Sequence, residues 1–107
     1  MRAIIAVSVL LVLCATVHGE PDIRILQGEA LAREMCAHCH AVGATGQSPH
    51  PAAPAFRAME RRLEDLDHFF DRLRQGLTSG HPDMPTYLFR RDDARNLIAY
   101  LRSLQKP

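Results

Sequence analysis

One five-residue run limits the folds open to this chain more than any other feature of its sequence. Cysteines stand at positions 36 and 39, and His40 follows the second one directly. Cys-x-x-Cys-His is the spacing that attaches a c-type haem: each thiol adds to a vinyl group of the porphyrin, and the histidine is then held under the iron. A chain carrying this group must fold around a large apolar plate. We therefore predict one covalent haem c, with Cys36 and Cys39 as its thioethers and His40 as an axial ligand of the iron.

Two other uses of these residues stay open. In an oxidising compartment Cys36 and Cys39 could form a disulfide, although this does not account for the adjacent His40. A structural zinc site would need four ligands, and the sequence has no second cysteine pair to supply them.

The first nineteen residues have the features of a secretory signal. Arg2 gives a positive start, residues 3–13 are small or apolar apart from one serine, and residues 17–19 offer small or compact side chains to a signal peptidase. We expect cleavage before Glu20 and delivery to the periplasm. Residues 20–107 then form a single domain.

Two alternatives to cleavage at this site remain. The apolar run is short for a membrane span, but it could be kept as an anchor. Cys14 suggests a lipoprotein, although Leu13 before it is bulkier than the small residue that a lipobox requires.

The charge balance excludes some classes of partner. Once Arg2 is removed with the signal, twelve basic residues balance twelve acidic ones, and Lys106 is the single lysine. Such a chain shows no basic footprint for nucleic acid and no polybasic patch for a membrane surface. We expect a monomer, without nucleic acid or strong membrane association, that meets redox proteins transiently.

Apolar residues recur with a helical period of about 3.6, and no useful strand-like alternation occurs. The pattern predicts an all-α fold of three to five short helices wrapped around the haem. We place helices at residues 22–35, 56–62 and 63–75, with a last one from residue 91 onward. Their core-facing residues include Leu66, Phe69, Phe70 and Leu73 in one helix and Ala94, Leu97, Ile98, Tyr100, Leu101 and Leu104 in the last.

Glycine and proline interrupt this helical pattern twice. Residues 42–54 and 77–88 are rich in both, so each is expected to be a loop. A glycine also stands inside the first helix, where it costs about 1 kcal/mol relative to alanine. Gly28 therefore marks a close approach by another helix.

The second of these loops offers the other iron ligand. Met84 has a soft thioether, and pairing it with a histidine raises the potential of a haem. Pro82 and Pro85 restrict the backbone on both sides of it. We predict that His40 and Met84 are the two axial ligands.

Other side chains compete for that position. His81 is the main rival, because an imidazole can also bind the iron, and an open position is a further alternative. Met59 is disfavoured by its charged helical surroundings, and Met35 is too close to Cys36 to reach the opposite haem face. We expect no chemical role for the remaining histidines, His38, His50 and His68, with His38 facing solvent.

Taken together, these features resemble the class I cytochrome c family, of the small soluble bacterial type. Gly28 resembles the glycine where the family's first and last helices cross, with Leu97 and Tyr100 packed against it. Asp83-Met84-Pro85 is similar to the ligand loop. The resemblance implies a small cytochrome c-type fold.

The resemblance also implies a role for Pro54. Residues 53–56 are similar to the family's Pro-x-Leu segment, where the proline carbonyl accepts a hydrogen bond from the ligating histidine. Pro54 would therefore tune His40. Two departures are Phe56, which replaces the usual leucine, and Ala32, which stands where many relatives carry an aromatic residue at the helix crossing.

We expect an exported carrier of single electrons between redox proteins, and not an enzyme. Two alternatives remain open: a haem-based module that binds or senses a small ligand when Met84 is labile or absent, and a small haem subunit of a dehydrogenase or oxidase complex.

Overall fold

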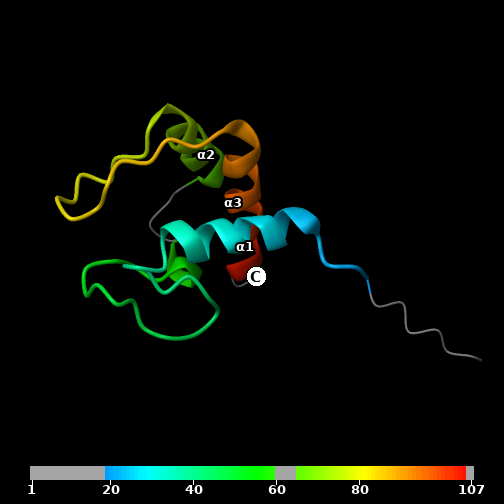
Figure 1. Ribbon diagram of the computed structural model, residues 1–107, viewed down its shortest axis with the longest axis horizontal. Coiled ribbons are helices and arrows are strands. Elements are labelled where there is room, and N and C mark those ends of the chain that lie inside the picture. The colour runs from blue at the N-terminus through cyan, green and yellow to red at the C-terminus, as the bar shows by residue number, and fades with distance from the viewer. Residues whose placement is uncertain (1–18, 60–64, 106–107) are drawn as a thin grey trace, which may run out of the picture.

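The computed structural model describes residues 19–59 and 65–105. In chain order, the elements are α1 (Ile23–Met35), the short 3-10 helix η1 (Phe56–Ala58), α2 (Leu66–Gln75) and α3 (Arg91–Leu104) (Figure 1). The only strand-like pairing in this part of the chain is an isolated bridge between Leu77 and Tyr87. The all-α prediction is therefore confirmed.

Side-chain caps explain where the helices begin. The carboxylate of Asp22 accepts a hydrogen bond from the main-chain N–H of Arg24 (2.9 Å), which fixes the start of α1. Asp65 caps α2 in the same way through the N–H of Asp67 (2.8 Å). At the other end of α2, Gly76 has a φ of 113°, a conformation that favours glycine.

Two predicted helices differ in extent from those observed. The helix expected at residues 56–62 is a single 3-10 turn that ends at Ala58, with its remainder partly outside the described residues. The helix expected from residue 63 begins at Leu66, because Asp65 is extended and serves as the cap. Residues 1–18, and with them almost all of the predicted signal segment, also lie outside the described part.

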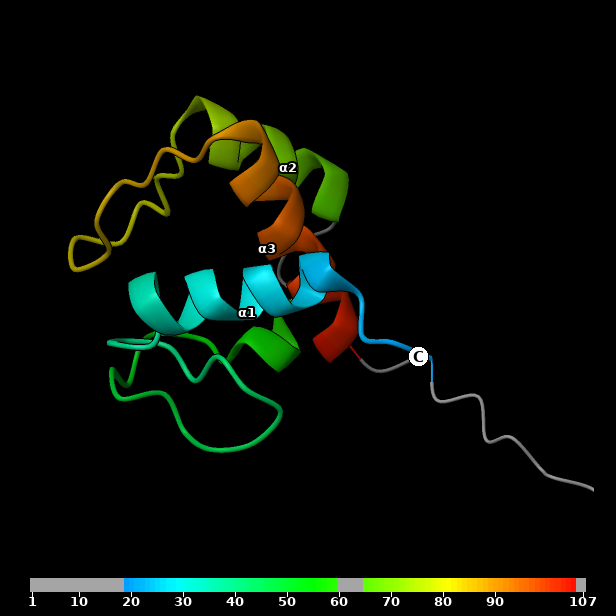
Figure 2. The same cartoon turned by 45° about the vertical axis from the view of Figure 1, so that its right-hand side comes forward.

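Helices α1 and α3 cross and form the framework of the domain (Figures 1 and 2). Gly28 lies at the crossing: a Cβ added there would overlap the main-chain oxygen of Asn96 and would lie 2.8 Å from the Cβ of Tyr100. The close approach predicted from Gly28 is thus confirmed. Ala32, one turn further along α1, is completely buried, so the smaller side chain leaves no opening at this position.

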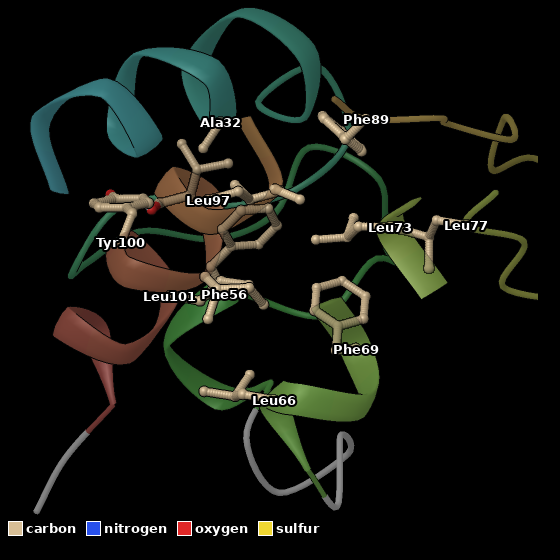
Figure 3. Packing of buried hydrophobic residues seen from close by; sticks show 13 residues of the cluster. Ala32, Phe56, Leu66, Phe69, Leu73, Leu77, Phe89, Leu97, Tyr100 and Leu101 are labelled. Atoms are coloured by element: carbon tan, nitrogen blue, oxygen red, sulfur yellow. The ribbon is translucent and has the colours of Figure 1, made fainter. Parts of the chain in front are cut away.

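A core of apolar side chains fills the space between the helices. Figure 3 shows Phe56, Leu97 and Leu101 at its centre, with residues of α2 and the segment after it on one side. The α3 face is buried as predicted, except that Leu104 is half-buried. On α2, the buried residues are Leu66, Phe69 and Leu73, while Phe70 is half-buried.

The long loops leave the helical framework on the same side. In both views, residues 41–55 and 77–88 extend past the C-terminal end of α1, one on each side of it (Figures 1 and 2). Within residues 19–59 and 65–105, no helix is long and apolar enough to cross a membrane.

One buried hydrogen bond ties the first loop to the core. The hydroxyl of Tyr100 donates to the main-chain oxygen of Val42 (2.6 Å), and both residues are buried. We expect Tyr100→Phe to lower the free energy of unfolding by about 1–2 kcal/mol, because a buried carbonyl loses its partner. Urea unfolding would measure this change.

The matched control for this variant is Tyr87→Phe. The Tyr87 hydroxyl donates to the main-chain oxygen of Met35 at a longer distance (3.2 Å) and in a half-buried setting. Tyr87→Phe should therefore lower the free energy of unfolding by less than Tyr100→Phe. Equal or reversed effects of the two substitutions would contradict the larger contribution expected from the Tyr100 hydrogen bond.

Candidate functional site

A cavity of about 750 Å³ opens between the two long loops and the core. This volume lies in the range of sites that enclose a small molecule or cofactor. Its lining includes Cys36, Cys39, His40, Pro54 and Met84, so all the residues predicted for the site meet on one cavity. Apolar side chains such as Phe56, Phe69, Leu73 and Leu97 supply much of its wall.

The turn at the end of α1 positions the two thiols and the histidine. The main-chain N–H groups of Cys39 and His40 both donate to the oxygen of Cys36, at 3.2 and 2.9 Å. This turn points Cys36, Cys39 and His40 into the same space. His38, between the cysteines, is exposed as predicted.

Both cysteines of the motif are free thiols and half-buried. Burial raises the pKa of the Cys36 thiol to about 11, so this thiol is neutral at physiological pH. The disulfide alternative therefore does not describe this structure. The zinc alternative also lacks support in the described part of the chain, where no three His, Cys, Asp or Glu side chains are grouped to hold a metal ion.

His40 is buried, with 8% of its surface exposed. Its Nδ1 lies 2.7 Å from the main-chain oxygen of Pro54, which can only accept a hydrogen bond. Nδ1 must therefore carry the proton, and in the neutral imidazole Nε2 keeps its lone pair. The hydrogen bond expected between His40 and Pro54 is present, and it leaves Nε2 able to bind a metal.

The Phe56 ring packs against this imidazole. The two ring centroids are 5.4 Å apart and the planes are inclined by 55°. Phe56 is buried, so the larger side chain in place of leucine is accommodated as part of the wall behind His40.

Two other histidines on the cavity are held in the opposite tautomer. The Nδ1 of His81 accepts from the N–H of Asp83 (3.2 Å), and the Nδ1 of His50 accepts from the N–H of Ala52 (3.1 Å). In their neutral forms the proton is then on Nε2, which has no lone pair to offer. Of these three histidines, only His40 therefore keeps a lone pair on Nε2. This weakens His81 as a rival ligand of the iron.

Three methionines line the cavity. Met84, on the second long loop, is half-buried, packs against the core and lines the cavity. Met59 follows η1 and lines the cavity too, although the sequence placed it within a helix, next to charged residues. Met59 is three residues from Phe56, which packs on the His40 ring. Met35 precedes Cys36 directly.

Sequence reasoning missed two polar features of this site. Among residues 19–59 and 65–105, Arg72 on α2 is the only arginine or lysine that lines the cavity, and its Nη2 donates to the oxygen of Thr78 (2.9 Å). His50 and Asp83 meet at 3.1 Å across the two loops. Arg72 stands next to the buried Leu73, but so does the exposed Arg74, so the sequence did not single out either one. Nothing in the sequence pairs His50 with Asp83.

Comparisons with known proteins agree with this geometry. Residues 24–101 match the protein family described as cytochrome c oxidase, cbb3-type, subunit III. The chain is 37% identical over 79 residues to cytochrome c-552 of Bradyrhizobium diazoefficiens, covering 73% of this chain and 72% of the relative. No solved structure matches the chain. Its motif, its helical fold and both similarities show that the chain belongs to the cytochrome c family, whose members carry electrons with a covalently bound haem c and are not enzymes.

Proposed function

We propose that this protein is an exported carrier of single electrons, with one haem c attached through Cys36 and Cys39 and its iron held by His40 and Met84. The proposal rests on the tautomer of the His40 imidazole. Its Nδ1–H is bound to the Pro54 carbonyl, so the free Nε2 is available on a cavity that both thiols and Met84 also line.

The cavity suits this cofactor in size and chemistry. Its wall is largely apolar, as a porphyrin requires, and Arg72, which also lines it, can balance the carboxylates of a haem. When bound, the haem supplies the one-electron redox chemistry. The protein's part is to bind it, exclude water and hold both ligands through a change of charge.

Each proposed ligand is held by its own segment. The Pro54 carbonyl fixes the tautomer and orientation of His40, and a hydrogen bond of this kind also makes an imidazole a stronger ligand. Met84 stands between Pro82 and Pro85, whose rings limit the backbone conformations around it. Little atomic rearrangement is then needed when an electron is transferred.

Exchange of Met84 for leucine tests the second ligand. Leucine keeps the volume of the side chain but cannot bind iron. In the oxidised Met84→Leu protein we expect loss of the weak red sulfur-to-iron absorption band. The midpoint potential should fall, since axial ligands move haem potentials over a range of about 0.8 V and methionine favours the reduced state.

Met59→Leu is the matched control, because Met59 lies on the same cavity. This variant should keep both the band and the potential of the wild type. A band that survives in Met84→Leu but disappears in Met59→Leu would transfer the ligand role to Met59.

Export and haem number are tested together by mass. In a host with c-type haem maturation, the periplasmic protein should have the intact mass of residues 20–107 plus one haem. A mass that includes residues 1–19 would show that the segment is kept, and the absence of haem would remove the proposed function.

One observation favours a second role, as a subunit of an oxidase. The family model that matches residues 24–101 is described as subunit III of a cbb3-type cytochrome c oxidase. Mild detergent extracts of the source cells should then show this chain migrating with a large haem-containing complex on native gels. Migration at the size of the isolated chain would favour the free carrier.

A further inference from the structure

The segment that carries Met84 is exposed apart from Met84 itself. We call residues 79–85 the Met84 loop tip. Six of its seven residues are exposed, and Met84 alone is half-buried. The base of the loop is secured by the Leu77–Tyr87 bridge, with N–O distances of 2.7 and 3.2 Å. The tip lies beyond that bridge, so the bridge does not hold it directly.

Most hydrogen bonds of the tip stay within it. The N–H of His81 donates to Ser79 Oγ (3.0 Å), and the N–H of Met84 donates to the oxygen of His81 (3.2 Å). Among the described residues, a single hydrogen bond joins the tip to another segment: His50 Nε2 with Asp83 Oδ2, at 3.1 Å. The rings of His50 and His81 also meet edge to face, with centroids 5.8 Å apart.

His50 is itself attached to the haem-binding motif. Its main-chain N–H donates to the oxygen of Cys39 (3.1 Å), and its Nδ1 accepts from the N–H of Ala52 (3.1 Å). With Nδ1 used as an acceptor, the neutral ring carries its proton on Nε2 and donates it to Asp83. A chain of contacts therefore runs from Cys39 through His50 to Asp83, the residue directly before Met84.

We propose that His50 and Asp83 are positioning residues that hold Met84 on the iron. This inference rests on the proposed ligation by Met84. Without the contact between His50 and Asp83, only the bridge at its base and the packing of the half-buried Met84 against the core would hold the tip. It could then swing outward and take the thioether with it, which would leave the iron open to other ligands. The contact opposes this motion by tying the tip to the loop beside the motif. It thereby favours the closed electron carrier over a site that binds small molecules.

The exposure of the His50 and Asp83 side chains determines how much their contact contributes. The side chains of His50 and Asp83 are 30% and 64% exposed, so their contact is partly screened by water. We expect its loss to raise the open population about three- to fivefold. Carbon monoxide binds reduced haem iron only when the position is open, so its binding rate reports this population.

The test uses the reduced holoprotein and carbon monoxide. His50→Ala and Asp83→Ala should each raise the binding rate about three- to fivefold, because both break the hydrogen bond between His50 and Asp83. The double variant should do no more than His50→Ala, which also removes the ring contact with His81. His50→Gln should restore the wild-type rate, since its amide N–H can reach Asp83. His68→Ala, which changes an exposed histidine of α2 away from the cavity, is the control.

A second measurement separates positioning from general stability. In the oxidised single variants, the sulfur-to-iron band should disappear at a lower temperature than in the wild type, while the helical signal melts unchanged. Wild-type rates in both single variants, additive effects in the double variant, or a parallel fall of both melting transitions would overturn the positioning role. A wild-type protein without the band would instead remove Met84 as the ligand, and the proposed function would fail with it.

Discussion

Exchange of His40 for alanine is expected to lower the yield of stable holoprotein at least about tenfold, because metal binding and folding are coupled in a site of this kind. In the described structure, the His40 ring is buried and held by the Pro54 carbonyl with its Nε2 free. Alanine removes the proposed ligand and leaves a void beside Phe56. Haem absorbance per purified chain, together with spin state, would measure the loss.

His38→Ala is the control for this prediction. His38 lies between the same two cysteines but is exposed. Its removal should leave both the yield and the low-spin spectrum at wild-type values. A His40→Ala protein with normal six-coordinate haem would show that another side chain binds the iron.

Exchange of Gly28 for alanine is expected to destabilise the holoprotein by about 2–3 kcal/mol, the upper part of the usual cost of overpacking. The added Cβ would overlap the main-chain oxygen of Asn96, and backbone cannot rotate away as a flexible side chain does. Helices α1 and α3 must then separate. The better helix propensity of alanine offsets only about 1 kcal/mol. The midpoint of urea unfolding measures the difference.

Gly43→Ala supplies the comparison for this substitution. A Cβ at Gly43 would meet nothing within 4 Å, and its φ is not positive. Stability should therefore be unchanged or slightly increased. If Gly28→Ala and Gly43→Ala unfold at the same urea concentration, the crossing at Gly28 tolerates wider spacing than its geometry indicates.

Local sequence signals were sufficient to predict the helices that begin at a capping residue or have an apolar face. Asp22 marks the start of α1, and the apolar face of α3 predicts which of its residues are buried. Gly28 predicted the helix crossing, because the helix stability lost with a glycine has to be offset by a close contact at that position. The residues proposed for the haem were also found by sequence, since a short motif and a proline-flanked methionine carry their chemistry within a few positions.

Features that depend on contacts between distant segments were not predictable. The turn at Phe56 ends after Ala58, although the local sequence allows a longer helix, and Met59, expected within that helix, lines the cavity. His50 and Asp83 are separated by 33 positions and meet only because two loops pass the same end of α1. Neither residue type is unusual in a loop, so nothing in the sequence marks the pair.

The acceptor of the His40 hydrogen bond is a main-chain oxygen, and this has a consequence for how the protein tolerates mutation. Every amino acid has a carbonyl, so no substitution at position 54 can delete the group that orients the imidazole. A change there can shift the oxygen by altering the backbone, but it cannot remove the interaction in one step. The side-chain contact between His50 and Asp83 lacks this protection, because a single base change can abolish it. Random mutation should therefore alter how firmly Met84 is held more readily than it alters the orientation of His40.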